Sequence, residues 1–247
     1  MSTSSSSHTK IALVTGATRG IGLETVRQLA TQGVRTLLAG RDHARTVEAT
    51  LKLQADGLPV EAIDLDVTDG ASIAAAADTV RKQHGRLDIL VNNAGVMRDD
   101  MAATPSQQSL DTWRGTFETN VFGLVATTNA LLPLLRESPA GRIVNLSSIL
   151  GSNTEHSDPA SPIYGFKVPA YDVSKSAVNA WTVHLAHELR DTPIKVNAVH
   201  PGSVQTDMNA GGDMDIVDGA KSSVRMALLD ADGPSGSFTH RGEVLPW

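Results

Sequence analysis

The sequence contains no cysteine among its 247 residues. Disulfides, thiolate nucleophiles and cysteine-ligated metal sites are therefore excluded, and a reducing compartment is expected. The eight histidines are scattered. The one close pair, His184 and His187, is spaced i, i+3 without the acidic partner of a zinc motif. We therefore predict no metal site.

Long apolar runs and clusters of basic residues are also missing. No apolar run approaches the ~18 residues that a membrane-spanning helix needs. With 21 basic and 27 acidic residues the net charge is −6, which argues against nucleic acid or an anionic membrane as a partner. Residues 1–9 are rich in serine and lack the apolar core of a signal peptide. We expect a disordered leader over 1–9 and a cytoplasmic protein.

From residue 10 onward, short apolar runs alternate with stretches of helical pattern. The expected strands are Ile11–Val14, Thr36–Ala39, Val60–Ile63, Leu87–Val91, Arg142–Leu146 and Ile194–Val199, and the expected helices are Gly22–Gln32, Ala71–His84, Gln108–Leu135 (kinked or ended near Pro133) and Tyr171–Arg190. Such alternation predicts an α/β fold, with helices flanking a doubly wound parallel sheet of the Rossmann type. No linker divides residues 10–247, which we interpret as one domain. In such sheets ligands bind at the carboxyl ends of the strands.

The loop after the first strand is rich in glycine. Gly16, Gly20 and Gly22 stand between a predicted strand and a predicted helix, where glycine lets the backbone approach a phosphate held by the helix N-terminus. The residues between them that would also contact the phosphates are Thr18, Arg19 and Ile21. This loop predicts a dinucleotide site.

The end of the second strand indicates which dinucleotide is bound. NAD enzymes usually place an acid there to bind the ribose 2′-hydroxyl, but position 40 is glycine and Arg41 follows it. Arg41, with Arg19 converging on the same point, suits the 2′-phosphate of NADP(H). Asp42 is the alternative ribose ligand if the strand runs further; otherwise it pairs with Arg41.

The catalytic candidates lie later in the chain. Tyr171 and Lys175 are spaced i, i+4, which puts a phenol and an ammonium on one face of a helix. A tyrosine has an ordinary pKa of about 10, and a neighbouring cation is expected to lower it. Tyr164 is a rival phenol, with its nearest lysine, Lys167, at i+3.

Taken together, these motifs resemble the short-chain dehydrogenase/reductase family. The resemblance rests on the glycine spacing of the first loop, Asn92-Asn93-Ala94-Gly95, Asn120, the strand-end serines, the Tyr171/Lys175 pair and the turn from Pro201 to Thr206, and it covers about residues 11–208. It implies a catalytic tetrad of Asn120, Ser148, Tyr171 and Lys175, with Ser147 the less favoured serine. In that scheme Ser148 polarises the substrate oxygen and Tyr171 exchanges its proton. Lys175 binds the nicotinamide ribose, and Asn120 holds a water.

The resemblance also implies further cofactor contacts. These are Asp66 and Val67 at the adenine, Asn93, Ala94 and Gly95 along the cofactor, and Pro201, Gly202, Val204 and Thr206 at the nicotinamide. With the residues named above they predict NADP(H) as the cofactor and a small carbonyl or alcohol compound as the substrate.

Two departures from the family pattern refine the prediction. The interval from Ser148 to Tyr171 is long, so we interpret residues 153–168 as an insertion, with Ile163, Tyr164 and Phe166 forming a wall of the substrate site. The ending of the chain resembles that of the carbonyl-reductase and menthone/salutaridine-reductase subgroup. These features favour an NADPH-dependent carbonyl reductase. A 3-oxoacyl-thioester reductase and a non-catalytic NADP sensor are the alternatives, and monomer or homo-oligomer is left open.

Overall fold

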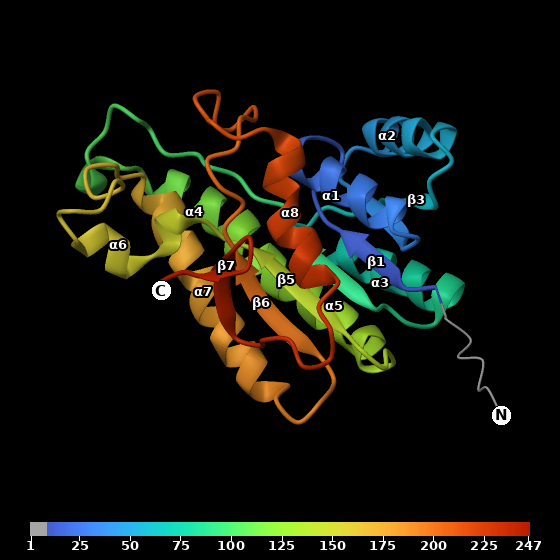
Figure 1. Cartoon of the computed structure of the whole chain (residues 1–247). Helices are drawn as coiled ribbons and strands as arrows, with labels where there is room; N and C mark the ends of the chain where they lie inside the picture. Colours follow the sequence, from blue (N-terminus) through green and yellow to red (C-terminus); the bar gives the residue numbers. More distant parts are fainter. Residues whose placement is uncertain (1–8) are drawn as a thin grey trace.

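The structure, a computed structural model, describes residues 9–247, so nearly all of the predicted leader lies outside the described residues. Its centre is one eight-stranded sheet in the order β3-β2-β1-β4-β5-β6-β7-β8 (Figure 1). The strands are β1 (Ile11–Val14), β2 (Arg35–Gly40), β3 (Val60–Asp64), β4 (Ile89–Asn92), β5 (Arg142–Leu146), β6 (Lys195–Val199), β7 (Ser237–His240) and β8 (Glu243–Val244). All neighbours pair in parallel except β7 and β8. The strand order reverses between β1 and β4, as in a doubly wound fold.

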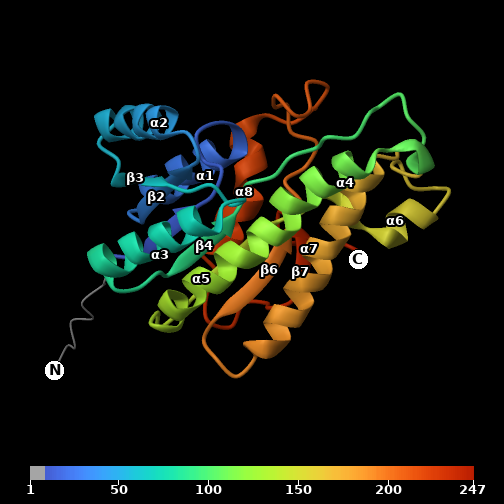
Figure 2. The same ribbon diagram turned by 180° about the vertical axis from the view of Figure 1, so that it is seen from behind.

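Helices cover both faces of this sheet. On one face lie α1 (Gly20–Thr31), α2 (His43–Ala55) and α8 (Ile216–Ala227); on the other lie α3 (Gly70–His84), α4 (Leu110–Phe117), α5 (Leu124–Arg136) and α7 (Pro169–Glu188) (Figures 1 and 2). Each face has its own buried cluster, one containing Leu29 and Val224 and the other Leu131 and Leu185. The central strands are therefore buried on both sides, which explains their unbroken apolar runs.

The structure corrects the prediction of one long helix over Gln108–Leu135. A π-helical turn over Glu118–Gly123 separates α4 from α5, and Pro133 lies inside the last turns of α5, which continues to Arg136. The sequence analysis also overlooked α2, α8, β7, β8 and the short helix α6 (Asn153–Ser157) within the insertion.

A buried chain of amides and hydroxyls ties the two central strands to the helices beside them. Asn92 of β4 donates to Asn145 Oδ1 of β5 and to Thr128 Oγ1 of α5, both at 2.9 Å. Asn145 in turn donates to Thr182 Oγ1 of α7 at 2.9 Å. Because Asn92 and Asn145 are also register partners, their amides favour the pairing that aligns the ends of these strands.

The turn that leaves β5 packs directly on α7. It comprises Ser147, Ser148 and the 3-10 helix η3 (Ile149–Gly151). A Cβ on Gly151 would lie 2.8 Å from the carbonyl carbon of Lys175 and 2.9 Å from its Cβ. The Gly151 carbonyl also accepts a hydrogen bond from Ser176 Oγ at 2.9 Å. Only glycine lets the turn and the helix approach so closely.

We therefore expect Gly151→Ala to destabilise the protein by about 1–3 kcal/mol, because the added methyl overpacks a contact made by backbone atoms. Thermal and urea unfolding measure this. Gly70→Ala is the matched control, since Gly70 begins α3 and a Cβ there meets nothing within 4 Å. Equal stability of the two variants would contradict the packing argument.

Candidate active site

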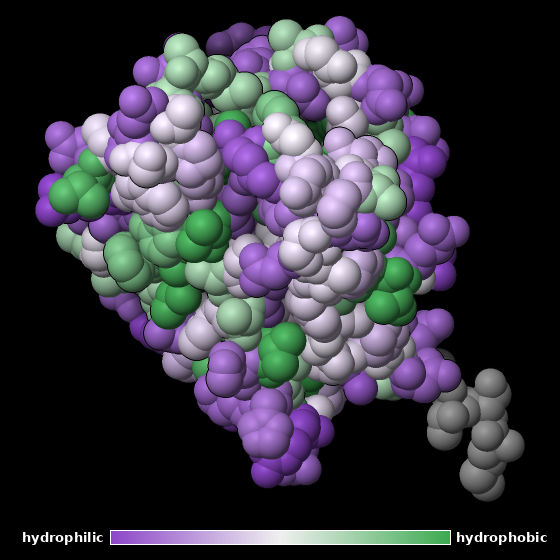
Figure 3. Space-filling view, turned by 90° about the vertical axis from the view of Figure 1, so that its left-hand side faces the viewer, coloured by the Kyte–Doolittle hydropathy of each residue, from purple (hydrophilic) through white to green (hydrophobic). Residues whose placement is uncertain are grey.

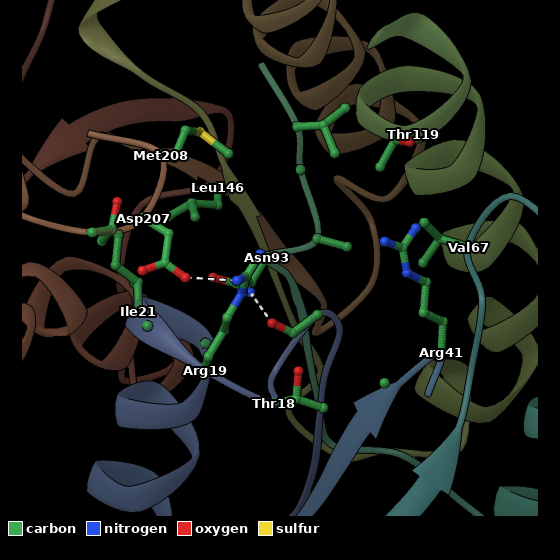
Figure 4. Close-up of a pocket in the computed structure, with 18 of the residues that line it drawn as sticks. Thr18, Arg19, Ile21, Arg41, Val67, Asn93, Thr119, Leu146, Asp207 and Met208 are labelled. Carbon is green, nitrogen blue, oxygen red and sulfur yellow. Dashed lines mark hydrogen bonds and ion pairs between the residues drawn. The ribbon is translucent and has the colours of Figure 1, made fainter. Parts of the chain in front are cut away.

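A cleft of about 800 Å³ lies at the carboxyl ends of the strands, where the topology places ligands. Most predicted cofactor residues line it. They are Gly16, Thr18, Arg19, Gly20, Ile21, Gly22, Arg41, Asp66, Val67, Asn93, Ala94, Gly95, Tyr171, Lys175, Pro201 and Thr206. Figure 4 shows part of this lining around the glycine loop.

Four predicted residues do not line the cleft. Val204 is 3% exposed and packs on Gly219 of α8, and Gly202 faces Met214, whose Cε would lie 2.6 Å from an added Cβ. Asn120 and Ser148 are not among the lining residues, whereas their sequence neighbours Thr119 and Ser147 are.

The glycine loop and the start of α1 leave donors facing the cleft. Arg19 is the N-cap residue of α1 and its side chain makes no capping hydrogen bond, so no side chain satisfies the first-turn N–H groups. Gly20 has a φ of +57°, and a Cβ there would meet nothing within 4 Å. Asn93 fixes the loop from the other side, since its Nδ2 donates to the Thr15 carbonyl at 2.7 Å. The arrangement is a preformed anion site at a helix N-terminus.

The predicted convergence of Arg19 and Arg41 is not found. Arg19 Nη1 lies 2.6 Å from Asp207 Oδ2, and the Arg41 side chain points elsewhere (Figure 4). β2 ends at Gly40, and Asp42 caps α2 by accepting from the Arg45 N–H at 3.1 Å. Asp42 is thus engaged by α2 and by Arg45 Nε, 3.7 Å away, and not by Arg41.

The sequence analysis missed several residues of the cleft. Arg45, one helical turn beyond Arg41, adds a second cation at the end of β2, and its i, i+4 spacing was the available signal. Asp207 and Met208 close the cleft from the loop after β6. The ion pair of Asp207 with Arg19 joins residues 188 positions apart, and no local pattern indicates it.

Tyr171 and Lys175 line the cleft together, and Ser148, outside this lining, lies next to Tyr171. Burial raises the pKa of Tyr171 to about 12, while a hydrogen bond with Ser148 lowers it and the charge of Asp172 raises it. Burial lowers the pKa of Lys175 to about 8. Lys175 Nζ donates to the Leu146 carbonyl at 2.6 Å and lies 5.5 Å from the centre of the Tyr171 ring. The expected lowering of the Tyr171 pKa by its lysine is therefore not observed, because desolvation is the larger effect.

Asn120 contacts the backbone that borders the cleft. Its Oδ1 accepts from the Val96 N–H and its Nδ2 donates to the Val96 carbonyl, both at 2.8 Å. Nδ2 also donates to Ser174 Oγ at 3.0 Å. Asn120, in the π-helical turn, thus links the Asn93–Val96 segment to α7.

Ser147 and Ser148 have different partners. Ser147 Oγ donates to the Lys175 carbonyl at 3.4 Å. Ser148 Oγ accepts from the Leu150 N–H at 3.2 Å, and its interaction with Tyr171 lowers the pKa of the phenol. Tyr164, the rival phenol, is 46% exposed and its ring lies 5.3 Å from Lys167 Nζ. No residue of 153–168 lines the cleft, so the pocket-wall role of Tyr164 and Phe166 stays a prediction.

Two further properties concern the whole described chain. Within residues 9–247, no helix is long and apolar enough to cross a membrane. The same residues contain no group of three or more histidine, aspartate or glutamate side chains that could hold a metal ion.

Comparisons with known proteins agree with this geometry. Residues 10–215 match the family model described as short chain dehydrogenase. The chain is 36% identical to "Short-chain dehydrogenase/reductase 1" of Saponaria officinalis, over 96% of each chain. It is 34% identical to "Carbonyl reductase [NADPH] 1" of Bos taurus, over 98% of this chain and all of the other.

A solved structure, salutaridine reductase from Papaver somniferum, is similar with a TM-score of 0.81 and 31% identity, covering 93% of this chain and 99% of the other. The match of family model, sequence and fold extends over most of the chain and includes the cleft described above. The chain belongs to the short-chain dehydrogenase/reductase family of oxidoreductases.

Proposed function

We propose that this protein is an NADPH-dependent oxidoreductase that reduces a ketone or aldehyde to the alcohol, and reversibly oxidises the alcohol. The observation that carries the proposal is that Tyr171 and Lys175, with Ser148 beside Tyr171, stand in the same cleft as a glycine-rich anion site. The relatives named carbonyl reductase and salutaridine reductase support a carbonyl substrate.

The outer part of the cleft fits a phosphorylated dinucleotide. The uncapped N-terminus of α1 and the open space at Gly20 suit a pyrophosphate. Arg41 and Arg45 stand where β2 ends, and their charges suit a 2′-phosphate. Arg19 would add a third positive charge to Arg41 and Arg45 when its ion pair with Asp207 opens. The relative that is named for NADPH supports the same choice.

When bound, NADPH supplies the hydride that reduces the carbonyl carbon. The protein's own part is to hold the carbonyl oxygen and deliver a proton. Ser148 would donate a hydrogen bond to that oxygen and Tyr171 would transfer its phenolic proton as negative charge develops. Lys175 would bind the nicotinamide ribose. Asn120 holds the Val96 backbone in this structure, and a water beside it would reconnect Lys175 with solvent.

Burial raises the pKa of Tyr171 and so makes it suitable as the acid in reduction. With a pKa of about 12 it remains protonated through the neutral range, so the proton is present when the oxygen becomes basic. The reverse reaction requires the phenolate, which becomes more populated as pH rises. Reduction is therefore favoured at neutral pH and oxidation at alkaline pH.

Tyr171→Phe should lower kcat for carbonyl reduction by several orders of magnitude while NADPH affinity and the fold are kept, because only the proton donor is removed. The measurement is NADPH consumption against a panel of ketones, aldehydes, quinones and acyl thioesters, with affinity from NADPH fluorescence. Tyr164→Phe is the matched control, as it removes the only other phenol of the chain. If that variant loses turnover and Tyr171→Phe keeps it, the catalytic assignment is wrong. A preference for acyl thioesters within the panel would favour the 3-oxoacyl-thioester alternative.

Arg41→Ala should weaken NADPH binding by about 1.5–3 kcal/mol, the scale of a lost charge-assisted hydrogen bond, and should hardly change NADH binding. Titration of both cofactors by fluorescence or calorimetry gives the two values. Arg45→Ala tests the neighbouring cation in the same way. Equal losses for NADPH and NADH would show that Arg41 does not bind the 2′-phosphate.

A further inference from the structure

The insertion brings two basic side chains to the start of α7. His156, on α6, lies with Nε2 3.0 Å from the Leu150 carbonyl and 3.4 Å from Asp172 Oδ2. Lys167 Nζ lies 2.8 Å from His156 Nδ1. Because Nδ1 accepts from the ammonium, Nε2 carries the ring proton and is shared between Leu150 and Asp172. One ring thus joins the turn that carries Ser148 to the helix that carries Tyr171.

Asp172 is the buried member of this cluster. Its side chain is 8% exposed, Oδ2 accepts from the Val168 N–H at 3.0 Å, and Oδ1 is buried with no hydrogen-bond partner. A carboxylate with one unsatisfied buried oxygen is costly, which makes it sensitive to nearby charge. Asp172 follows Tyr171 in α7, and its charge raises the pKa of that phenol.

Other titratable groups face the same place from the loop after β4 and from α7 itself. Asp99, in that loop, accepts from the N–H groups of Ala170 and Tyr171 at 2.8 and 3.0 Å. On α7, Tyr171 and Lys175 follow one face. The start of α7 therefore has two carboxyl groups beside it, and the insertion provides one ammonium, Lys167, and one imidazole, His156.

We propose that His156 and Lys167 of the insertion are positioning residues that hold and partly neutralise Asp172, and through it adjust the acid–base step at Tyr171. The inference rests on the proposed function, in which Tyr171 exchanges the substrate proton. It gives the insertion an electrostatic role at the base of α7, separate from any contact with substrate.

The pKa directions agree with this coupling. Burial and then the charge of Asp99 raise the pKa of Asp172 to about 7, opposed by the Val168 hydrogen bond and by Lys167. Burial and then Lys167 lower the pKa of His156, which keeps the ring neutral. The charge of Asp172 in turn raises the pKa of Tyr171. Near neutral pH a lysine ammonium is charged and Asp172 is close to its pKa, so loss of Lys167 should raise the pKa of Asp172 further.

The test is a double-mutant cycle of Lys167→Met and Asp172→Asn, read from the pH profile of carbonyl reduction between about pH 5 and pH 9, where a lysine ammonium is charged. Lys167→Met should move the inflection that reports Asp172 upward by about 0.5–1 pH unit, as one partly screened charge does. Asp172→Asn should remove that inflection, with or without Lys167. If the profile has no inflection that Asp172→Asn removes, or if Lys167→Met does not move it, the proposal is overturned. Asp158→Asn, an exposed acid of the insertion, is the control for a general charge effect.

A second measurement does not need activity. The chain has two tyrosines, so in a Tyr164→Phe background the ultraviolet phenolate band reports Tyr171 alone. Asp172→Asn should move the onset of that band to lower pH, because the charge of Asp172 raises the pKa of Tyr171. Shifts in the band of a protein inactive on every substrate would uphold the coupling while the proposed function failed. An active enzyme whose band and profile do not respond would overturn the coupling alone.

Two further variants separate positioning from charge. His156→Gln keeps a donor near Nε2 and should retain most of kcat, whereas His156→Leu should lose it with little change in KM. A merely structural role predicts equal losses of stability and no split between kcat and KM.

The raised pKa of Asp172 also predicts how the stability of the wild type depends on pH. Because the folded state raises the pKa of Asp172 from 3.8 to about 7, ionising it costs folding free energy that grows from pH 4 to pH 7. Asp172→Asn should therefore gain Tm relative to the wild type over this range. A constant Tm difference across it would contradict the buried carboxyl.

Discussion

The contact between the Ile149–Gly151 turn and the backbone of Lys175 fixes the relative positions of the catalytic candidates. The turn follows β5. Ser176, the residue of α7 that donates to the Gly151 carbonyl, lies 25 positions after Gly151 in the sequence. Ser148 and Tyr171 lie on the two sides of this junction, and Ser148 lowers the pKa of the phenol. Because the contact is made by backbone and not by flexible side chains, it allows little adjustment. Precision of this kind is what proton transfer over one hydrogen bond requires.

Burial, more than any single ion pair, sets the charge states at this junction. It raises the pKa of Tyr171 and lowers that of Lys175, so both side chains are biased toward their neutral forms. A neutral phenol donates its proton only when a sufficiently strong base forms beside it. The oxygen of a carbonyl that is receiving a hydride becomes such a base. The site therefore favours the protonated reactant state and responds to charge that develops on the substrate.

The sequence predicted those features that depend on local pattern. The glycine loop, the Asn92–Gly95 turn and the spacing of Tyr171 and Lys175 were found because each occupies one short segment. Other features of the site depend on contacts between residues that are far apart in the sequence. Asp99 holds the first N–H groups of α7 from 71 and 72 positions away, and nothing in the segment around Asp99 marks it as a helix cap.

Helix α8 shows a different reason for failure. Its buried apolar residues, Ala220, Val224 and Ala227, recur at helical spacing and form an amphipathic pattern. The pattern was present in the sequence and was overlooked, because small polar residues such as Ser222 and Ser223 share the same buried face. The π-helical turn at Asn120 was hidden for another reason, since one extra residue in a turn leaves the composition unchanged. The direction of the Tyr171 pKa was mispredicted because desolvation depends on burial, which residue spacing does not report.

The insertion carries exposed apolar side chains and a largely buried histidine at the same end of the molecule. Tyr164 and Phe166 are 46% and 41% exposed. Figure 3, which views the end of the molecule that carries α6, shows apolar residues in separate areas among polar ones. The side chains of His156 and of Asp172 on α7, in contrast, are 14% and 8% exposed and face each other. None of these four residues lines the cleft. The predicted contact with substrate and the proposed control of charge beside Tyr171 would therefore fall to different side chains, the first to Tyr164 and Phe166 and the second to His156 acting on Asp172.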